Sequence, residues 1–470
     1  MFFKPEIAPI VNKQAAIMSD GKQLSYQELY LTVKQLEDSI SDRSLIFCLC
    51  TNTIGSMVGY MAIIGANHVG VMIDAKMPLA QLNELIKKYR PSKLWAPTDH
   101  EIVNDYNEVV YHQHGYLLLD TKEKNPPDLY SDLALLLPTS GSTGSAKFVR
   151  LTRKNLEANA QSIAEYLNID SNERPITALP MHYSFGLSII NSHLIKGATI
   201  LMTQNSIMEK NFWTFLEESD ATSLSGVPYT YQMLKRLGVM KREYPSLKTF
   251  TQAGGKLNNK LIGEFDRFCS DSGKKFIVMY GQTEATARIS YLPEGSLPEK
   301  EGSVGIAIPG GEINILDDDG REVLHTEVGE LIYSGDNVSL GYAESADDLK
   351  KRDEFNGVLK TGDLARKDQD GFVYIVGRKK RFLKVFGNRI NLDEIEAHLR
   401  TISADVACGG RDDRLYTFIV DEEIKEQIKA AIIEKVQLHP SAFRIEVIEQ
   451  IPKNSAGKIL YAELNREVAA

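Results

Sequence analysis

The sequence predicts an α/β protein with a large N-terminal α/β layered domain, a small β subdomain, and a small C-terminal α+β domain. The chain has 470 residues, more than one hydrophobic core usually accommodates, so at least two domains are expected. Across residues 130 to 290, short apolar runs alternate with amphipathic segments, which is typical of a layered α/β domain. From about Gly302, glycine and β-branched residues become frequent, which indicates β-hairpins.

The elements of the large domain follow from their hydrophobic patterns. "SLIFCLC" predicts a buried strand, and the apolar stretch 57–73 predicts a buried helix and strand. Residues 133–137 and 148–151 predict two more buried strands, and Thr152 can cap the helix that follows. Later strands are predicted in "ITALP", "ATILM", "KTFTQAGG" and "KFIVMYG", and a helix in "NKLIGEFDRFCSDSG".

The last third of the chain predicts a β subdomain and a separate C-terminal domain. Hairpins are expected in "GGEINILDDDGREV" and "GELIYSGDNV". A basic run, "RKKRFLK", then precedes the helical pattern "NLDEIEAHLR". Residues 379–470 contain 15 basic and 15 acidic residues, so the net charge of −9 belongs to the preceding part. This shift predicts a large domain over 1–379 and a small domain over 380–470.

Composition and charge argue against several classes of protein. Hydrophobic residues at 43% and charged residues at 25% are ordinary for globular proteins, so disordered or fibrous structure is not expected. The net charge of −9 argues against nonspecific nucleic-acid binding, which needs many cations facing phosphates. The four cysteines form no C-x-x-C pair, and Cys48 and Cys50 alternate along a predicted buried strand. Core thiols in a reducing compartment are therefore expected.

The sequence shows neither a targeting segment nor a membrane span. "MFFKPEIAPIVNK" has no basic region followed by a long apolar run. The apolar stretch 57–73 is interrupted by Asn67 and His68, so it predicts a buried helix and strand instead of a membrane span. A cytoplasmic protein is expected.

The segment "LLLPTSGSTGSAKFVRLT", residues 135–152, is a candidate phosphate site. Ser/Gly-rich segments are often linkers or turns, but this one lies between two predicted core strands. Backbone N–H groups of small residues, hydroxyls and a lysine form a concave donor surface that suits phosphate oxygens. The spacing G-x-x-G-x-x-K differs from G-x-x-x-x-G-K-[ST], which disfavours a P-loop NTPase. The candidate ligands are Thr139, Ser140, Gly141, Ser142, Thr143, Gly144 and Lys147.

A second signal is "MYGQTEATARIS", which follows an apolar strand. Tyr280, next to Gly281, can stack on a flat base, because it lies at a strand end. The hydroxyl of Thr283 can bond phosphate, and the carboxylate of Glu284 can hold Mg²⁺ against phosphate oxygens. Taken alone the signal is weak, and a core tyrosine with a surface glutamate is the commoner alternative.

Two further signals lie in the last quarter of the chain. Asp363 and Arg378 bracket a predicted hairpin, and a carboxylate so placed can bond the vicinal hydroxyls of a ribose. The alternative is a surface ion pair of little energetic value. In "IPKNSAGKIL", Lys458 follows a Ser-Ala-Gly turn, and the alternative there is a solvated lysine.

The four signals, in this order, resemble the adenylate-forming superfamily of acyl-CoA synthetases, aryl-acid ligases, carrier-protein adenylation domains and luciferases. The resemblance extends over nearly the whole chain. It is also carried by "LSYQELYLTV", "GVPYTYQML", "VGELIYSGDNVSLGY" and "GRKKRFLKVFGNRINLDEIE". It implies an ATP-dependent and Mg²⁺-dependent reaction of a carboxylic acid that gives an acyl adenylate and pyrophosphate, followed by transfer to a thiol.

The resemblance implies a role for each candidate residue. Residues 139–147 correspond to the phosphate loop, Tyr280 to the adenine-stacking residue, and Thr283 and Glu284 to the phosphate and Mg²⁺ ligands. Asp363 and Arg378 correspond to the ribose contacts. The remaining assignments are Lys458 as the catalytic lysine, His182 at the mouth of the thiol tunnel, and Gly254 and Gly255 between adenine and the acyl pocket.

The resemblance also implies that the C-terminal domain is mobile. In relatives it swings about a hinge after adenylation, withdrawing the lysine and presenting a second face for thiol attack. Here Lys380 occupies the hinge position, and the swing would bring Gly387 near the thiol channel. Such an alternation is a hinge motion of the kind that a few element-terminal residues absorb.

The resemblance leaves the substrate and the thiol open. Amino-acid-activating relatives place an Asp near "PMHYSFGLSII", where this chain has no acidic residue, so an acyl or aryl acid is favoured over an amino acid. The favoured acceptor is CoA, and the phosphopantetheine of an acyl carrier protein is the alternative. A non-catalytic nucleotide-binding homologue is the alternative of a different class. The retained motifs argue against it.

Overall fold

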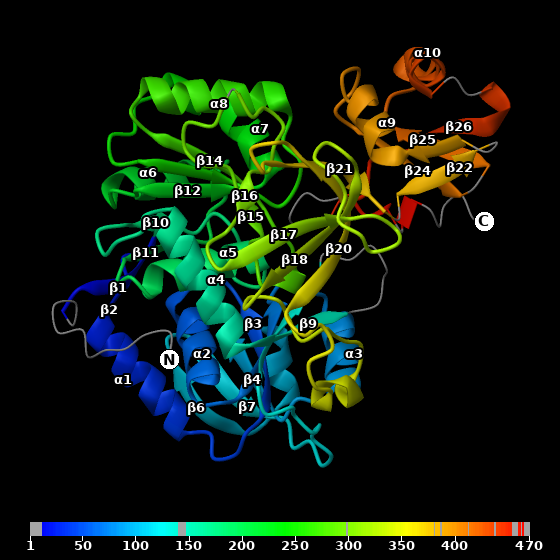
Figure 1. Ribbon diagram of the computed structural model, residues 1–470. Helices are drawn as coiled ribbons and strands as arrows, with labels where there is room; N and C mark the ends of the chain where they lie inside the picture. The colour runs from blue at the N-terminus through cyan, green and yellow to red at the C-terminus, as the bar shows by residue number, and fades with distance from the viewer. Residues whose placement is uncertain are drawn as a thin grey trace.

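The computed structural model describes residues 12–139, 147–297, 299–379, 381–385, 388–411, 413–436, 439–453, 459–461 and 463–464. Two large sheets form the body of the protein, with helices on both faces of each (Figure 1). The strand order of one sheet is β19-β9-β8-β4-β3-β5-β7-β6. Its strands are β3 (Leu45–Cys50), β4 (Val69–Asp74), β5 (Lys93–Pro97), β6 (Val109–Gln113), β7 (Tyr116–Asp120), β8 (Leu133–Pro138), β9 (Phe148–Thr152) and β19 (Tyr342–Ala343).

The second sheet has the order β16-β15-β14-β13-β12-β10-β11-β1-β2. Strands β10 to β14 and β1 pair in parallel, and β2, β15 and β16 pair antiparallel at the two edges. Its strands are β1 (Gln14–Met18), β2 (Gln23–Ser25), β10 (Pro175–Ile176), β11 (Ile200–Met202), β12 (Ser223–Gly226), β13 (Thr249–Gln252), β14 (Lys275–Tyr280), β15 (Ser290–Tyr291) and β16 (Ile306–Ala307).

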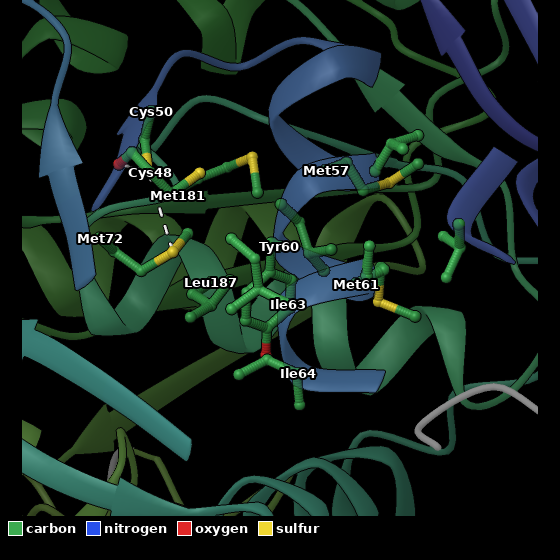
Figure 2. Close-up of a cluster of buried hydrophobic side chains, with 14 of the residues drawn as sticks. Cys48, Cys50, Met57, Tyr60, Met61, Ile63, Ile64, Met72, Met181 and Leu187 are labelled. Atoms are coloured by element: carbon green, nitrogen blue, oxygen red, sulfur yellow. Dashed lines mark hydrogen bonds between the residues drawn. The ribbon is translucent and has the colours of Figure 1, made fainter. Parts of the chain in front are cut away.

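Helices between the two sheets share one hydrophobic cluster with both of them. Its residues come from the inner faces of the two sheets and from α1 (Tyr26–Asp38), α2 (Ile54–Gly65), α4 (Arg153–Tyr166) and α5 (Ser184–Leu194). Figure 2 shows part of this cluster: Tyr60 and Ile63 of α2 lie near Leu187, and Met57 and Met61 extend from the other side of the helix. The outer faces are covered by α3 (Leu79–Tyr89) on one sheet and by α6 (Lys210–Glu218), α7 (Pro228–Arg236) and α8 (Asn259–Asp271) on the other.

Strand β3 shows how the sequence produces this layering. Successive side chains of a strand point to opposite faces. Ile46, Cys48 and Cys50 accordingly pack in the cluster between the sheets, whereas Phe47 and Leu49 pack in the outer cluster with α3. All four cysteines of the chain are free and buried, as expected for core thiols.

The small β subdomain differs in one respect from the expectation. The two runs predicted as separate hairpins form one strand each, β17 (Gly311–Leu316) and β18 (Gly329–Gly335), and these strands pair with each other. Within the first run the chain turns back at residues 317–321 but pairs only briefly, through the isolated bridge between Leu316 and Glu322 and the bond from the backbone N–H of Val323 to the carbonyl of Ile315. The order β17-β18-β20-β21 is completed by the predicted hairpin of β20 (Val358–Lys367) and β21 (Val373–Arg378).

The C-terminal part has a hydrophobic cluster whose buried members all lie between residues 383 and 443. Asn391 caps its first helix by accepting from the backbone N–H of Asp393, which explains why the helix begins at Leu392. Figure 1 shows this part beside β21. Its elements are β22 (Phe382–Val385), β23 (Asn388–Asn391), α9 (Leu392–Leu399), β24 (Val406–Arg411), β25 (Arg414–Ile419), α10 (Lys425–Val436) and β26 (Phe443–Val447). The α/β fold class is confirmed, and the boundary at 379/380 stays a prediction.

No helix in the described part of the chain combines the length and the apolar character that crossing a bilayer requires.

Two buried histidines predict a loss of stability in mild acid. Burial lowers the pKa of both His68 and His193 to about 4 from the ordinary 6.5. In the unfolded chain these histidines become protonated as the pH falls below 6.5, whereas in the folded chain they stay neutral until about pH 4. The free energy of unfolding therefore falls as the pH falls from 6.5 towards 4. Between pH 6.5 and pH 5 each histidine is expected to cost about 1 to 2 kcal/mol of unfolding free energy.

The measurement is the free energy of urea unfolding at pH 7 and pH 5, compared with that of His68→Gln. Between pH 7 and pH 5 the unfolding free energy of the variant is expected to fall less than that of the wild type, by the amount that one histidine contributes. An identical pH dependence in both proteins would contradict the assignment.

Candidate active site

Lys147, Tyr342 and Glu284 form a chain of contacts at the base of the predicted phosphate loop. The antiparallel pairing of β8 and β9 brings Thr139 next to Lys147. The backbone N–H of Thr139 donates to the carbonyl of Lys147 at 3.2 Å. The Nζ of Lys147 lies 3.4 Å from the centroid of the Tyr342 ring. The hydroxyl of Tyr342 donates to Oε1 of Glu284 at 2.8 Å. A cation and a carboxylate from distant parts of the sequence thus contact one tyrosine.

Asp363 joins the end of β14 to the hairpin of β20 and β21. The hydroxyl of Tyr280 donates to its Oδ2 at 2.5 Å, and Nε2 of Gln282 donates to the same oxygen at 2.8 Å. The Nε of Arg378 lies 3.3 Å from Oδ1, since Asp363 and Arg378 are paired across the hairpin. Burial raises the pKa of Asp363, and Arg378, Tyr280 and Gln282 act in the opposite direction.

Thr283 and Glu284 lie in a tight turn after β14, the 3-10 segment Thr283–Ala285. Thr286, which ends this turn, has a φ of 63°, a value that β-branched residues rarely adopt. Its hydroxyl donates to the carbonyl of Asn337 at 2.7 Å, and the side-chain amide of Asn337 donates to the carbonyl of Ala285 at 2.9 Å. These bonds hold the turn in its unusual conformation and thereby fix the direction of Glu284.

His182 lies just before α5, and the first residue of α5, Ser184, contacts Thr283. The side-chain oxygens of Ser184 and Thr283 lie 3.2 Å apart. The Nε2 of His182 lies 3.8 Å from Oδ2 of Asp74, at the carboxyl end of β4, and its Nδ1 is buried without a partner among the described residues. Burial lowers the pKa of His182, and Asp74 opposes this. The imidazole is therefore neutral near pH 7.

Gly254 and Gly255 follow β13 and face the same region. Gly254 has a φ of +84°, and a Cβ there would lie 2.6 Å from the hydroxyl oxygen of Tyr183. A Cβ on Gly255 would lie 3.2 Å from Cγ of Pro228. The carbonyl of Gly255 accepts from Nε2 of Gln252 at 2.9 Å. The backbone of this loop therefore approaches the start of α5 closely, and its position between adenine and the acyl pocket stays a prediction.

The structure thus brings several of the sequence-predicted site residues into two connected groups of contacts. One group contains Tyr280, Asp363 and Arg378, and the other contains Lys147 and Glu284. Thr139 is bonded to the backbone of Lys147, whereas His182, Gly254, Gly255, Gly281 and Thr283 are described but belong to neither group of contacts. The remaining predicted site residues lie outside the described residues: Ser140, Gly141, Ser142, Thr143, Gly144, Lys380, Gly387 and Lys458.

Sequence reasoning missed Tyr342, Gln282 and Asp74. Tyr342 lies far from Lys147 in the sequence, and only the antiparallel pairing of β19 with β9 brings the two together. Gln282 could have been found, because it lies inside the motif that names Tyr280 and Thr283. Asp74 ends a strand of the first sheet, and nothing in its local sequence distinguishes it.

The residues present fit a Mg²⁺ ion held largely by phosphate oxygens. Glu284 supplies a carboxylate, which is the type of ligand that Mg²⁺ prefers. Within the described ranges, no cluster of three or more His, Cys, Asp or Glu side chains could hold a metal by itself. Mg²⁺ usually binds through one or two carboxylates together with substrate phosphates and water, which agrees with a single glutamate.

Gly281→Ala is expected to lower the free energy of unfolding by about 2 to 3 kcal/mol, in the range of overpacking substitutions. A Cβ at Gly281 would lie 1.9 Å from the carbonyl oxygen of Ala287, so the turn that carries Glu284 has to move. The matched control is Gly263→Ala in α8, where a Cβ meets no atom within 4 Å. In the control, helix propensity is expected to raise stability by roughly 0.5 to 1 kcal/mol. Urea unfolding of both variants is the measurement, and equal effects would contradict the packing argument.

Residues 8–343 match the family described as AMP-binding enzyme, and the chain belongs to this family and, with it, to the adenylate-forming superfamily. A long-chain-fatty-acid–CoA ligase of Salmonella typhimurium is 30% identical over 374 residues, which cover 76% of this chain and 64% of the relative. An oxalate–CoA ligase of Arabidopsis thaliana is 29% identical, over 72% of this chain and 68% of the relative. The chain thus spans somewhat less than two thirds of the length of the first of these relatives.

Solved structures share the fold over nearly the whole chain. An o-succinylbenzoate CoA synthetase of Bacillus subtilis, in complex with an acyl-adenylate intermediate, superposes with a TM-score of 0.78 at 22% identity, covering 98% of this chain and 96% of that one. An anthranilate CoA ligase in complex with anthranoyl-AMP has the same TM-score of 0.78 at 18% identity, covering 99% of this chain and 96% of that one. These likenesses confirm the predicted fold class.

Proposed function

We propose that the protein activates a carboxylic acid with ATP, forming an acyl adenylate and pyrophosphate, and then transfers the acyl group to the thiol of coenzyme A. The observation that carries this proposal is the pair of linked contact groups after β14. Tyr280 reaches Asp363 on one side of this turn, and Glu284 reaches Tyr342 and Lys147 on the other. A nucleoside and a polyphosphate need such neighbouring sites. Family membership supports the same reaction.

The nucleoside half is assigned to Tyr280, Asp363 and Arg378. A carboxylate offers about four acceptor positions. Tyr280 and Gln282 donate to one oxygen of Asp363, so acceptor positions remain for ribose hydroxyls. The bond from the Tyr280 hydroxyl also fixes the plane of the ring, which leaves its face to stack on adenine.

The phosphate half is assigned to Lys147, Thr283 and Glu284, together with Thr139 at the start of the loop. A carboxylate that attacks the α-phosphorus approaches a polyanion, so cations must lie where charge accumulates. Mg²⁺ supplies such a charge when it is bound at Glu284. Lys147 holds its ammonium against the ring of Tyr342 in the structure, at a distance where cation–π attraction operates. Preorganised groups of this kind commonly lower the barrier by roughly 3 to 4 kcal/mol each.

The thiol half-reaction is assigned to the region of His182. A neutral imidazole can accept a proton from a thiol, and burial, which lowers the pKa of His182, keeps it neutral. The hinge at Lys380 and the approach of Gly387 to the thiol channel belong to this proposal. The proposal that the protein works in the cytoplasm belongs to it as well, since ATP and CoA chemistry agrees with four free thiols.

An amino acid is a poor candidate for the acid. Residues 181–190 contain no carboxylate to hold an α-ammonium. Asp74, the acidic side chain that the structure places next to His182, lies 3.8 Å from that imidazole. An ammonium buried without its own partner is costly.

The test is ATP–pyrophosphate exchange with a panel of carboxylic and α-amino acids, followed by thioester assays. We expect exchange with at least one acid that lacks an α-ammonium, and no exchange with free α-amino acids. CoA and a phosphopantetheine carrier protein are then compared as acceptors of the adenylate, with CoA expected to react. Exchange with amino acids alone would refute the substrate class, and reaction with the carrier protein alone would refute the acceptor.

A further inference from the structure

Arg288 is a buried guanidinium without a described counter-ion. Its residue is 2% exposed, and no carboxylate in the described part of the chain lies within ion-pair distance of it. Its Nε donates to Sδ of Met279 at 3.4 Å, and its Nη1 donates to the carbonyl of Ala287 at 3.3 Å. The hydroxyl groups of Tyr166 and Tyr183 lie near it, and burial lowers its pKa. None of these contacts neutralises its charge.

Arg150 shows what a structural buried arginine looks like in the same protein. Its side chain is fully buried, and it donates to four backbone carbonyls and to the carboxylate of Glu354. These contacts join β9 to residues 340–354. Buried charges are ordinarily paired in this way. The contrast indicates that Arg288 is prepared for a partner that the chain itself does not supply.

Arg288 lines a cavity between α4, α5 and the face of the second sheet. The empty space of this cavity, its open mouth included, measures about 420 Å³. The guanidinium lies 4.0 Å from the centroid of the Phe185 ring, which lines the same cavity. The wall is mostly apolar with several hydroxyls, and its other members include Leu167, Ser188, Ile189, Ser225, Thr251 and Met279.

The cavity begins next to the candidate active site. Ser184 contacts Thr283, and the next residue of α5, Phe185, contacts Arg288. Ser184 and Phe185 are consecutive residues, so the turn at Thr283 and the guanidinium of Arg288 both lie at the start of α5. Glu173, the acidic residue that lines the cavity, precedes β10 at the amino ends of the parallel strands, whereas Arg288 follows β14 at their carboxyl ends.

The backbone of Arg288 is held in place by the strained turn. Its carbonyl accepts from Nδ2 of Asn337 at 2.8 Å and from Nδ2 of Asn159 at 3.4 Å. Asn337 is also the residue that holds the turn at Ala285 and Thr286. One network therefore directs Glu284 to the phosphate side and Arg288 to the cavity.

We propose that Arg288 binds a second anionic group on the acyl part of the substrate, so that the acid activated by this protein is a short dicarboxylic acid. The inference rests on the proposed function and names its substrate class. One carboxylate reacts at the phosphate side, and the other pairs with the guanidinium inside the cavity. An apolar acid would leave a buried charge unpaired, and a long alkyl chain would have to pass it.

The first test compares malonate, succinate and glutarate with their monomethyl esters and with butyrate in ATP–pyrophosphate exchange. The esters keep the shape and the carbonyl acceptor and remove one charge. At least one diacid is expected to exceed its ester in kcat/KM by roughly 100-fold, the size expected when one partner of a buried ion pair is removed. Arg288→Met is expected to erase this preference. An ester or butyrate that matches the best diacid overturns the proposal, as does an unchanged preference in the variant.

The second test measures binding and stability without turnover. Calorimetric titration with each diacid is expected to show binding to the wild type and none to Arg288→Met. Diacid binding without exchange would support the Arg288 site and count against the proposed reaction. Exchange with monoacids and no diacid binding would support the proposed reaction and overturn the Arg288 site. Without substrate, Arg288→Met is expected to have a higher thermal midpoint than the wild type, because it removes an unpaired charge. Arg150→Met, the matched control, is expected to lower the midpoint. A lower midpoint in both would show that Arg288 is structural.

Discussion

Replacing Glu284 with glutamine is expected to slow adenylate formation by roughly 100- to 1,000-fold, because one preorganised charge at the phosphate site is lost. The structure makes this substitution specific. The hydrogen bond to the Glu284 carboxylate comes from the Tyr342 hydroxyl to Oε1, and the amide oxygen of glutamine can still accept it. What the variant loses is the negative charge, and with it the affinity for Mg²⁺.

The measurement is the rate of ATP–pyrophosphate exchange as a function of Mg²⁺ concentration. Glu284→Gln is expected to require more Mg²⁺ for half-maximal rate and to keep the thermal midpoint of the wild type. Tyr342→Phe is the matched variant, since it removes the hydrogen bond and keeps the carboxylate and the aromatic ring beneath Lys147. It is expected to lose about tenfold, the size of one hydrogen bond to a charged group. A Mg²⁺ dependence that is unchanged in Glu284→Gln would rule out this residue as the ligand.

The parts of the fold that could be predicted from sequence are those set by local patterns. The alternation in "SLIFCLC" predicts a buried strand, and β3 is one. Thr152 caps α4 as expected, accepting from the backbone N–H of Asn155. The turn between β20 and β21 was also predicted, because Asp363 and Arg378 flank a run with clear strand and turn signals.

The pairing of distant segments could not be predicted in the same way. The runs over 310–323 and 329–338 each contain a turn signal, so each resembles a hairpin locally. Their strands pair with each other because β17 and β18 can form a ladder from Gly311 to Leu316, which buries Ile313 and Ile315 together. The turn within the first run still forms, but the strands of the sheet are defined by the longer ladder between β17 and β18.

The residues of the candidate site also divide into those that a local motif identifies and those that only the folded structure identifies. Tyr280, Thr283 and Glu284 lie in one motif and could be named from it. Arg288 lies a few residues further on, in the same run of sequence, and nothing distinguishes it there from a surface arginine. Its burial, the absence of a described counter-ion and the neighbouring cavity are what indicate a ligand-binding role for Arg288.

Replacing Lys458 with alanine is expected to abolish adenylate formation and largely to spare thioester formation from supplied acyl adenylate. The reason is that the proposed ammonium acts on the charge that develops at the α-phosphate, and a loss of roughly 3 to 4 kcal/mol corresponds to at least 100-fold. In the proposed reaction the thiol step follows a change of domain arrangement that removes the lysine, so it is not expected to depend on that charge.

Lys453 offers a matched control within the same motif. The described residues on either side of residues 454–458, Lys453 and Ile459, pair in an antiparallel bridge, and Nζ of Lys453 lies 2.8 Å from Oδ1 of Asp405 at the surface. Exposed ion pairs of this kind contribute little. Lys453→Ala is therefore expected to leave both half-reactions within about twofold of the wild type, in keeping with an effect below roughly 0.5 kcal/mol.

The two half-reactions are measured separately for each variant, by pyrophosphate exchange and by release of CoA thioester from chemically prepared acyl adenylate. Loss of exchange alone in Lys458→Ala means that the lysine acts before the domain rearrangement and is absent from the site after it. Equal loss of both half-reactions would instead make the residue a structural support of the C-terminal domain. Equal loss in Lys453→Ala would show that the segment as a whole, and not one ammonium, is needed. Because the two lysines lie close together in one motif, the comparison separates the charge from the fold that carries it.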